Sequence, residues 1–200
     1  MSREVSTVFI NLDIGQTISD GGLQYFREQK GQYSFKDPLS LAMVYDSFAP
    51  LPFASEGVST LADAFQFGAY YTVRPYQLLD QAVEWLQRYK FPHPRRVHIC
   101  KNNRDKVDQI ICHQLLSAEQ SHNGAVIVDD HGEALIRELE RLVAEEPEWR
   151  FAAERLLVVQ FGKNHFFSLP YWDDQNVQAL ITDINALYFD NSSLSKHVPI

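Results

Sequence analysis

Three aspartates occupy the positions in this sequence where carboxylates could act together. Asp13 follows the short apolar run Val8 to Leu12, and Asp129 and Asp130 follow the run Ala125 to Val128. An apolar run that stops abruptly at polar residues is typical of a buried strand entering a loop. Ligands of open parallel sheets bind outside the carboxyl ends of the strands. We therefore expect the three carboxylates to meet at one edge of a sheet.

Such a cluster favours a metal site. Carboxylates confined together repel one another and need a cation, a proton or a basic partner. Mg²⁺ suits this need, because it is usually bound by one or two carboxylates, water and substrate phosphate. The simpler alternative is that Asp13 caps a turn and that Asp129 or Asp130 caps the helix expected to begin near Gly132. The combination of two strand ends favours Mg²⁺.

The first apolar run and the residues after it resemble a known family. Val8 to Ile18 looks like the first motif of the haloacid-dehalogenase (HAD) superfamily, with Asp-x-Gly-x-Thr in place of the family's Asp-x-Asp-x-Thr. Val126 to Asp130 resembles its fourth motif in the Asp-Asp form, and Val73 to Asn103 resembles the stretch leading from the cap to the second motif. The likeness covers Val8 to Thr17 and Val73 to about Val143.

The resemblance implies a Mg²⁺-dependent hydrolase acting on a small phosphorylated compound. Asp13 would be the nucleophile and would form an aspartyl-phosphate intermediate. Thr17 would help to hold the motif loop. The implied metal ligands are Asp13, the backbone carbonyl of Gly15, and Asp129 or Asp130.

A lysine would stabilise the charge of the transferring phosphoryl group, and the sequence offers two. Lys106 matches better than Lys101, because it opens the helix predicted around Val107 to Leu115, where its side chain can point at the site. The alternative for Lys106 is a solvated residue in the first turn of that helix.

Two departures from the family pattern leave a second function open. Gly15 stands where the family has its general acid/base aspartate, and general acid–base assistance is typically worth ~10²–10⁴-fold in rate. The second motif normally places Ser or Thr at the end of its strand, where this chain offers Cys100, Lys101 and Asn102. The alternative is a catalytically degenerate HAD-like protein that binds a ligand or a protein partner.

Strands alternating with helices predict the fold class. Further apolar runs at Val97 to Cys100 and Leu156 to Phe161 are each followed by polar residues or glycine. Helical patterns cover about residues 75–89, 107–115, 135–143 and 177–188. This alternation predicts an α/β fold with a Rossmann-like, mostly parallel sheet and helices on both of its faces.

Residues 20–71 do not follow this alternation and are predicted to form an inserted cap or lid, with residues 1–19 and 72–200 as the core. The insertion holds eleven of the chain's 25 aromatic residues. These rings either form a small core of the cap or line a pocket above the strand ends. The same insertion is the place where a protein partner could bind.

Composition restricts the ligands and the cellular location that we expect for this protein. A formal net charge of −8 argues against nucleic-acid binding, whereas a phosphorylated small ligand remains compatible because a metal can supply local positive charge. No run approaches the ~20 apolar residues of a membrane span, and the first residues lack a signal sequence. The two cysteines, Cys100 and Cys112, fit a reducing compartment, with Cys100 expected to be buried and structural. We therefore expect a cytoplasmic protein that is not membrane-bound.

His131 is the histidine of most interest among the seven in the chain, because it follows the acidic pair directly. The histidines show no tight spacing typical of a metal site. We therefore interpret His131 as a surface or helix-start residue, with a metal ligand as the alternative.

Overall fold

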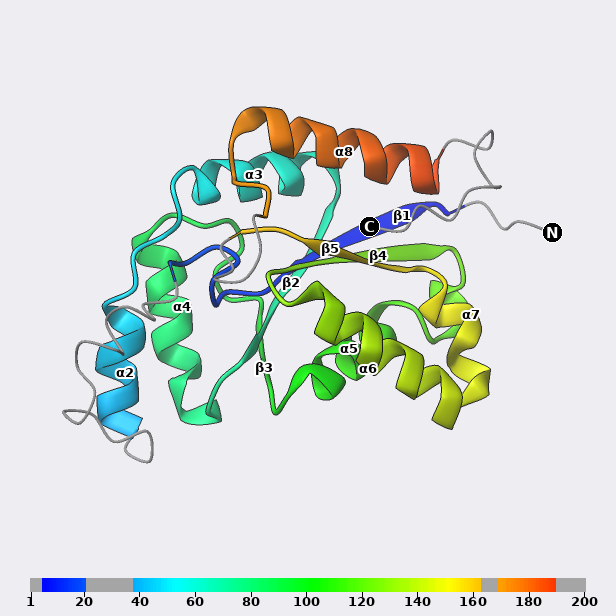
Figure 1. Ribbon diagram of the computed structural model, residues 1–200, viewed down its shortest axis with the longest axis horizontal. Helices are drawn as coiled ribbons and strands as arrows, with labels where there is room; N and C mark the ends of the chain where they lie inside the picture. Colours follow the sequence, from blue (N-terminus) through cyan, green and yellow to red (C-terminus); the bar gives the residue numbers. More distant parts are fainter. Residues whose placement is uncertain (1–4, 21–37, 163–168, 190–200) are drawn as a thin grey trace.

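Five parallel strands form a single sheet in the computed structural model, which describes residues 5–20, 38–162 and 169–189. The strand order is β3-β2-β1-β4-β5 (Figure 1). The strands are β1 (Thr7–Leu12), β2 (Gln66–Val73), β3 (Val97–Cys100), β4 (Asn123–Asp129) and β5 (Leu156–Gln160). The Rossmann-like α/β fold class predicted from the sequence is confirmed.

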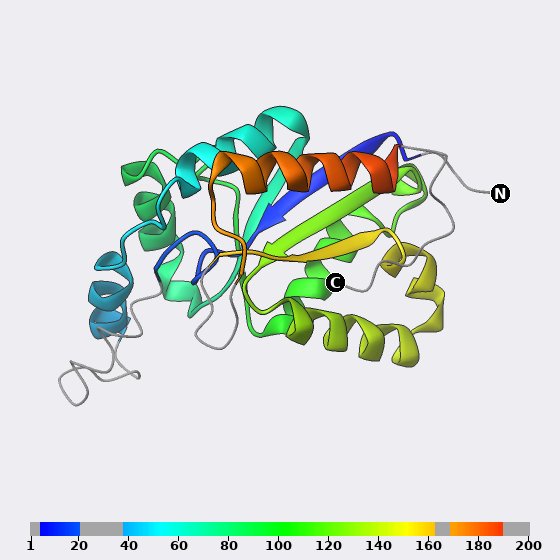
Figure 2. The same ribbon diagram turned by 45° about the horizontal axis from the view of Figure 1, so that its top comes forward.

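Helices cover both faces of this sheet, as Figures 1 and 2 show. One face carries α3 (Ala54–Ala64), α4 (Leu79–Arg88) and α8 (Asp174–Tyr188), whose apolar side chains share one core cluster. The other face carries α5 (Asn103–Gln114), α6 (Gly132–Glu145) and α7 (Arg150–Ala153), which share a second cluster. None of the helices in the described part of the chain is long and apolar enough to cross a membrane.

Side-chain caps fix the starts of two of these helices. The Asn102 side chain accepts a hydrogen bond from the backbone N–H of Asp105 at 2.9 Å, and so begins α5. Asp173 accepts from the backbone N–H of Asn176 at 2.8 Å and begins α8. An oxygen at the N-cap satisfies a backbone donor that has no partner within the helix. The Asn102 cap also determines where the side chains of the first turn of α5 point.

The predicted limit of the insertion, residue 71, falls inside β2. β2 pairs directly with β1, and its Phe67 and Tyr70 belong to the core cluster that lies under α3 and α8. A boundary at residue 71 would therefore cut through a strand of the sheet. We propose instead that the inserted segment ends before α3, at about residue 53.

The described part of the insertion contains α2 (Pro38–Asp46), which packs beside α4. Arg88 of α4 forms an exposed ion pair with Asp46 at 2.7 Å. Trp85, also of α4, donates its indole N–H to the carbonyl of Phe48 at 2.8 Å. These contacts hold the segment after α2 near the carboxyl ends of the strands.

The sheet has its topological switch point between β1 and β4. From β1 the chain adds β2 and β3 on one side, and then returns to add β4 and β5 on the other. Leu12 at the end of β1 lies opposite Val128 of β4. The crevice outside such a switch point is where open α/β sheets bind ligands.

Candidate active site

Asp13 and Asp129 lie side by side at the switch point. The residues before them, Leu12 and Val128, are register partners, and the backbone N–H of Asp13 donates to the carbonyl of Val128 at 2.9 Å. Both carboxylates are buried. The two strand ends thus meet as the sequence predicted.

Lys106 joins these two carboxylates. Its Nζ donates to Oδ1 of Asp13 at 2.9 Å and to Oδ2 of Asp129 at 2.6 Å. Its side chain extends from the first turn of α5 and is buried, with only 2% of the residue exposed. A solvated first-turn lysine is therefore excluded, whereas Lys101 is exposed.

Thr17 links the loop after β1 to the end of β4. Its hydroxyl donates to Oδ1 of Asp130 at 3.2 Å, and the backbone N–H of Asp130 donates to Oγ1 of Thr17 at 2.9 Å. The carbonyl of Thr17 accepts the indole N–H of Trp172 at 2.6 Å. Gly162 approaches the same loop so closely that a Cβ would lie 2.6 Å from the Thr17 carbonyl oxygen. The loop is therefore held from several sides.

Gly15 leaves open space in this loop. Among the described residues, a Cβ added there would meet a single neighbouring heavy atom within 4 Å, Oδ2 of Asp13 at 3.4 Å, which is an ordinary van der Waals distance. The backbone of Gly15 does not adopt a positive φ. Neither crowding nor backbone geometry therefore requires glycine at this position.

Burial and like charge dominate the electrostatics of the site. Burial raises the pKa of Asp13 to about 6; Lys106 opposes the rise, and Asp129 and Asp130 add to it. Burial by itself would lower the pKa of Lys106, but Asp13 and Asp129 outweigh burial and raise that pKa. Lys106 therefore keeps its charge, and three carboxylates face one ammonium group.

His131 completes the acidic cluster. Its Nδ1 lies 2.7 Å from Oδ2 of Asp130, and its backbone N–H donates to Oδ1 of Asp129 at 2.8 Å. The hydrogen bond with Asp130 raises the pKa of the imidazole. The ring itself is half exposed at the mouth of the site.

The donor set fits a divalent cation. Ligand atoms of Asp129, Asp130 and His131 lie within 4.8 Å of one another. Lys106 engages only one oxygen of Asp13, and the other oxygen faces Gly15. Carboxylate oxygens with an excess of negative charge are what Mg²⁺ requires. The resemblance implies Asp13, the carbonyl of Gly15, and Asp129 or Asp130 as the residues that would hold it.

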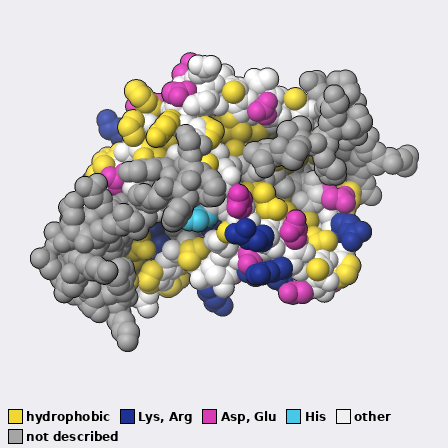
Figure 3. Space-filling view, viewed as in Figure 1, with side chains coloured by type: hydrophobic (Ala, Val, Ile, Leu, Met, Phe, Trp, Pro, Cys, Tyr) yellow, Lys and Arg dark blue, Asp and Glu magenta, His cyan; other side chains and the backbone are white. Residues whose placement is uncertain are grey.

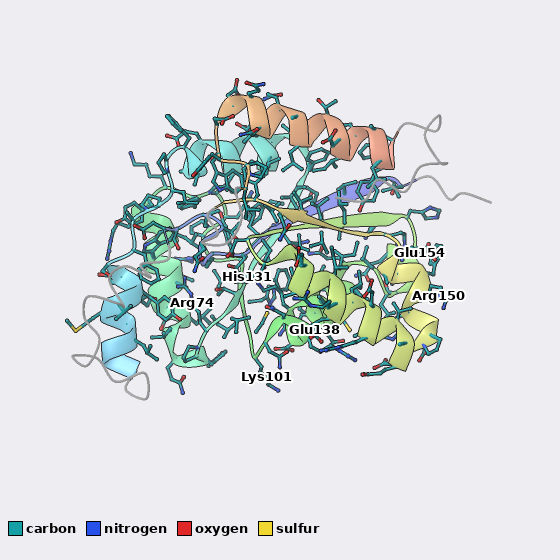
Figure 4. All side chains as sticks on the ribbon, viewed as in Figure 1. Arg74, Lys101, His131, Glu138, Arg150 and Glu154 are labelled. Carbon is teal, nitrogen blue, oxygen red and sulfur yellow. The ribbon has the colours of Figure 1, made fainter. Side chains whose placement is uncertain are left out.

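A cavity of about 530 Å³ lies above the strand ends. The insertion contributes Tyr45 and Phe48 to its wall, so two of the insertion's aromatic residues line the pocket. Arg74, Lys101 and His131 lie toward the left and centre of Figure 4, whereas Arg150 and Glu154 lie at the right-hand end of the molecule. Figure 3 shows acidic and basic side chains mixed over α6 on this face.

Thr72 is a cavity residue that the sequence analysis missed. It lies near the end of β2, is 2% exposed, and lines the cavity together with Asp13 and Lys106. The sequence resemblance places the second motif after β3, but the strand next to β1 is β2. The strand beside β1 therefore carries, near its end, a buried threonine that lines the cavity.

Cys100 is buried at the end of β3, as expected. Burial raises the pKa of its thiol to about 12. A thiol nucleophile needs a lowered pKa, so Cys100 does not have the properties of one.

Comparison with solved structures supports the HAD-like interpretation of the fold. No protein-family model matches the chain, and no curated protein matches it in sequence. The class C acid phosphatase from Bacillus anthracis aligns at 14% identity with a TM-score of 0.50, covering 88% of this chain and 78% of that one. The HAD domain of the effector protein Lem4 from Legionella pneumophila aligns at 12% identity and a TM-score of 0.47, covering 92% of this chain and 97% of that one. The chain has the haloacid-dehalogenase-like α/β fold.

Proposed function

We propose that this protein is a HAD-like hydrolase that removes the phosphoryl group from a small phosphorylated compound, with Asp13 as the nucleophile. The contact of Lys106 with both Asp13 and Asp129 carries the proposal. A cation held beside a buried carboxylate at the carboxyl ends of the strands suits the transfer of an anionic group. The cavity above this contact has room for a small ligand.

The chemistry would proceed in two displacements. A carboxylate oxygen of Asp13 attacks phosphorus, the bond from phosphorus to the leaving oxygen breaks, and an aspartyl phosphate forms. Water then attacks the phosphorus of this intermediate, so that inorganic phosphate leaves and the Asp13 carboxylate is restored. Lys106 and the hydroxyl of Thr72 would bind phosphoryl oxygens, while Thr17 holds the loop. Mg²⁺, when bound, would supply the positive charge that lets the anionic phosphate approach Asp13.

The open space at Gly15 limits which substrates would react well. A substrate whose leaving group is a weak acid needs a proton as the bond to phosphorus breaks, and glycine cannot supply one. The leaving groups of aryl phosphates and acyl phosphates are weaker bases, so they need this proton less. We therefore expect the enzyme to prefer them to alkyl phosphates.

The same open space favours the second candidate, a protein that binds a phosphorylated ligand without turning it over. The two candidates are separated by assaying aryl, acyl and alkyl phosphates with Mg²⁺, using the native protein and Asp13→Asn. Hydrolysis that disappears in Asp13→Asn supports the enzyme. Tight binding without hydrolysis supports the second candidate, and hydrolysis that persists in Asp13→Asn rules out Asp13 as the nucleophile.

A further inference from the structure

Arg74 is a buried cation beside the candidate active site. It follows β2, and only 8% of the residue is exposed. Within the described residues it stacks on Tyr45, whose ring centroid lies 4.3 Å from the guanidinium carbon, and its side chain forms no hydrogen bond or ion pair there. A guanidinium carries five N–H donors, and burying a charge without a partner is costly. This combination points to an anionic ligand.

The position of Arg74 separates two cavities. It lines the cavity that contains Asp13 and Lys106, and it also lines a neighbouring cavity of about 710 Å³. Lys101 lines the second cavity, as does Asp105, whose carboxylate accepts the backbone N–H of Lys101 at 2.7 Å. The guanidinium therefore lies between the cavity that contains Asp13 and a second, neighbouring cavity.

We propose that Arg74 binds a second anionic group of the substrate, a carboxylate or phosphate carried by the leaving group, while the transferring phosphoryl group lies at Asp13. The inference rests on the proposed function and specifies its substrate as a phosphorylated acid. Lys106, bound to Asp13 and Asp129, already provides the cation for the transferring group. Burial lowers the pKa of Arg74, and Tyr45 and Asp13 oppose this shift.

The inserted segment holds this guanidinium in place. Tyr45 belongs to α2, and its ring packs edge-on against Phe48 at a centroid distance of 5.4 Å. Phe48 in turn is fixed to α4 through the indole N–H of Trp85. A stacked arginine is restricted before the ligand arrives, so it loses less conformational freedom on binding. The insertion thus contributes to substrate choice through Arg74.

The test compares phenyl phosphate with its three carboxyphenyl isomers, which differ from it only by a carboxylate. Binding is measured by calorimetry with Mg²⁺ in the Asp13→Asn background, with Arg74 present or replaced by Gln. Arg141→Gln is the matched control, because this arginine is exposed in the last turns of α6. Arg74→Lys is included as a variant that keeps the charge but loses the planar fork of donors.

With Arg74 present, we expect the best carboxyphenyl isomer to bind about ten- to a hundredfold more tightly than phenyl phosphate, as for a charge-assisted hydrogen bond. Arg74→Gln should bring that ratio close to one and leave phenyl phosphate binding nearly unchanged. Arg74→Lys should give an intermediate ratio, and Arg141→Gln the native ratio.

Two results would overturn the inference. If Arg74→Gln weakens both ligands equally, then the guanidinium contacts the transferring phosphoryl group itself. If the ratio does not change, then no anion is bound at Arg74. Because binding is measured without turnover, a failure of the proposed hydrolase activity appears separately, as absence of hydrolysis by the protein with Asp13 intact.

Discussion

The Nζ of Lys106 bridges Oδ1 of Asp13 and Oδ2 of Asp129, at 2.9 and 2.6 Å. The two carboxylates come from adjacent strands that are far apart in the sequence, and the lysine comes from a third element, α5. This bridge lowers the repulsion between the buried carboxylates, and it places a cation where the proposed reaction needs one.

The bridge makes Lys106 important for stability as well as for activity. Lys106→Met should lower the free energy of unfolding by about 3–5 kcal/mol, because it leaves two buried carboxylates without their cation. Urea denaturation monitored by circular dichroism measures this change. Lys101→Met, which removes an exposed lysine two residues before α5, is the control and should stay within about 0.5 kcal/mol. Equal effects of the two substitutions would contradict the buried bridge.

The raised pKa of Asp13 predicts how stability depends on pH in the absence of metal. Folding raises the pKa of Asp13 from its ordinary 3.8 to about 6, so between these values the native state binds more protons than the unfolded state. The contribution of Asp13 to the free energy of unfolding is therefore fully present below about pH 4 and is lost as the pH rises through about 6.

Asp13→Asn mimics the protonated side chain and should avoid this loss. At pH 7 without Mg²⁺ it should be more stable than the native protein by on the order of 1–3 kcal/mol, and at pH 4 the two should be equal. Thermal and urea unfolding at the two pH values measure the difference, with Asp63→Asn on the exposed side of α3 as a control. A native protein that gains stability relative to Asp13→Asn as the pH rises would contradict the prediction.

Gly15→Asp tests whether the missing proton donor limits turnover. Within the described part of the chain the surroundings of Gly15 have room for a Cβ, so sterics allow the variant to fold. We expect hydrolysis of alkyl phosphates to increase by ~10²-fold or more, and that of aryl phosphates to increase much less. The comparison of kcat/KM for the two classes is the measurement, with Gly15→Asn as the variant that adds similar bulk without an acid. Equal gains in Gly15→Asn and Gly15→Asp would exclude proton transfer as the cause.

Removing the metal gives an independent prediction. Chelation with EDTA should abolish hydrolysis, and adding Mg²⁺ back should restore it, because the excess negative charge of the three carboxylates repels a phosphate. Mg²⁺ should also raise the melting temperature of the native protein, and do so less in Asp130→Asn. Hydrolysis that is unaffected by chelation would contradict the proposed role of the metal.

The strand ends and their carboxylates could be predicted from the sequence because β4 is buried along nearly its whole length and reads as an uninterrupted apolar run. The position of Lys106 followed from the start of the helix after Asn102. From the sequence, Lys106 was only a better match than Lys101. Which of the two lysines is buried depends on strands that are distant in the sequence.

β2 could not be recognised in the same way, and Thr72 and Arg74 were missed with it. A Cβ at its Gly68 would lie 2.1 Å from the side-chain oxygen of Asn11, so glycine there makes room for a buried amide. That amide bonds Gln114 of α5 at 2.9 Å and the backbone N–H of Ala69 at 3.1 Å. Gly68 is needed for a contact with residues distant in the sequence, and it interrupts the apolar pattern by which a strand is predicted. The aromatic residues around it also resemble those of the insertion, so β2 was assigned to the insertion.

The most direct test of the proposed function is to trap the intermediate. The protein is mixed with an aryl phosphate and Mg²⁺, quenched during turnover, and treated with borohydride, which reduces an aspartyl phosphate to homoserine. Peptide mass spectrometry then locates the modified residue. We expect homoserine at Asp13 only, and none when substrate is omitted. Turnover without modification of Asp13, or modification at Asp129 or Asp130 instead, would contradict Asp13 as the nucleophile.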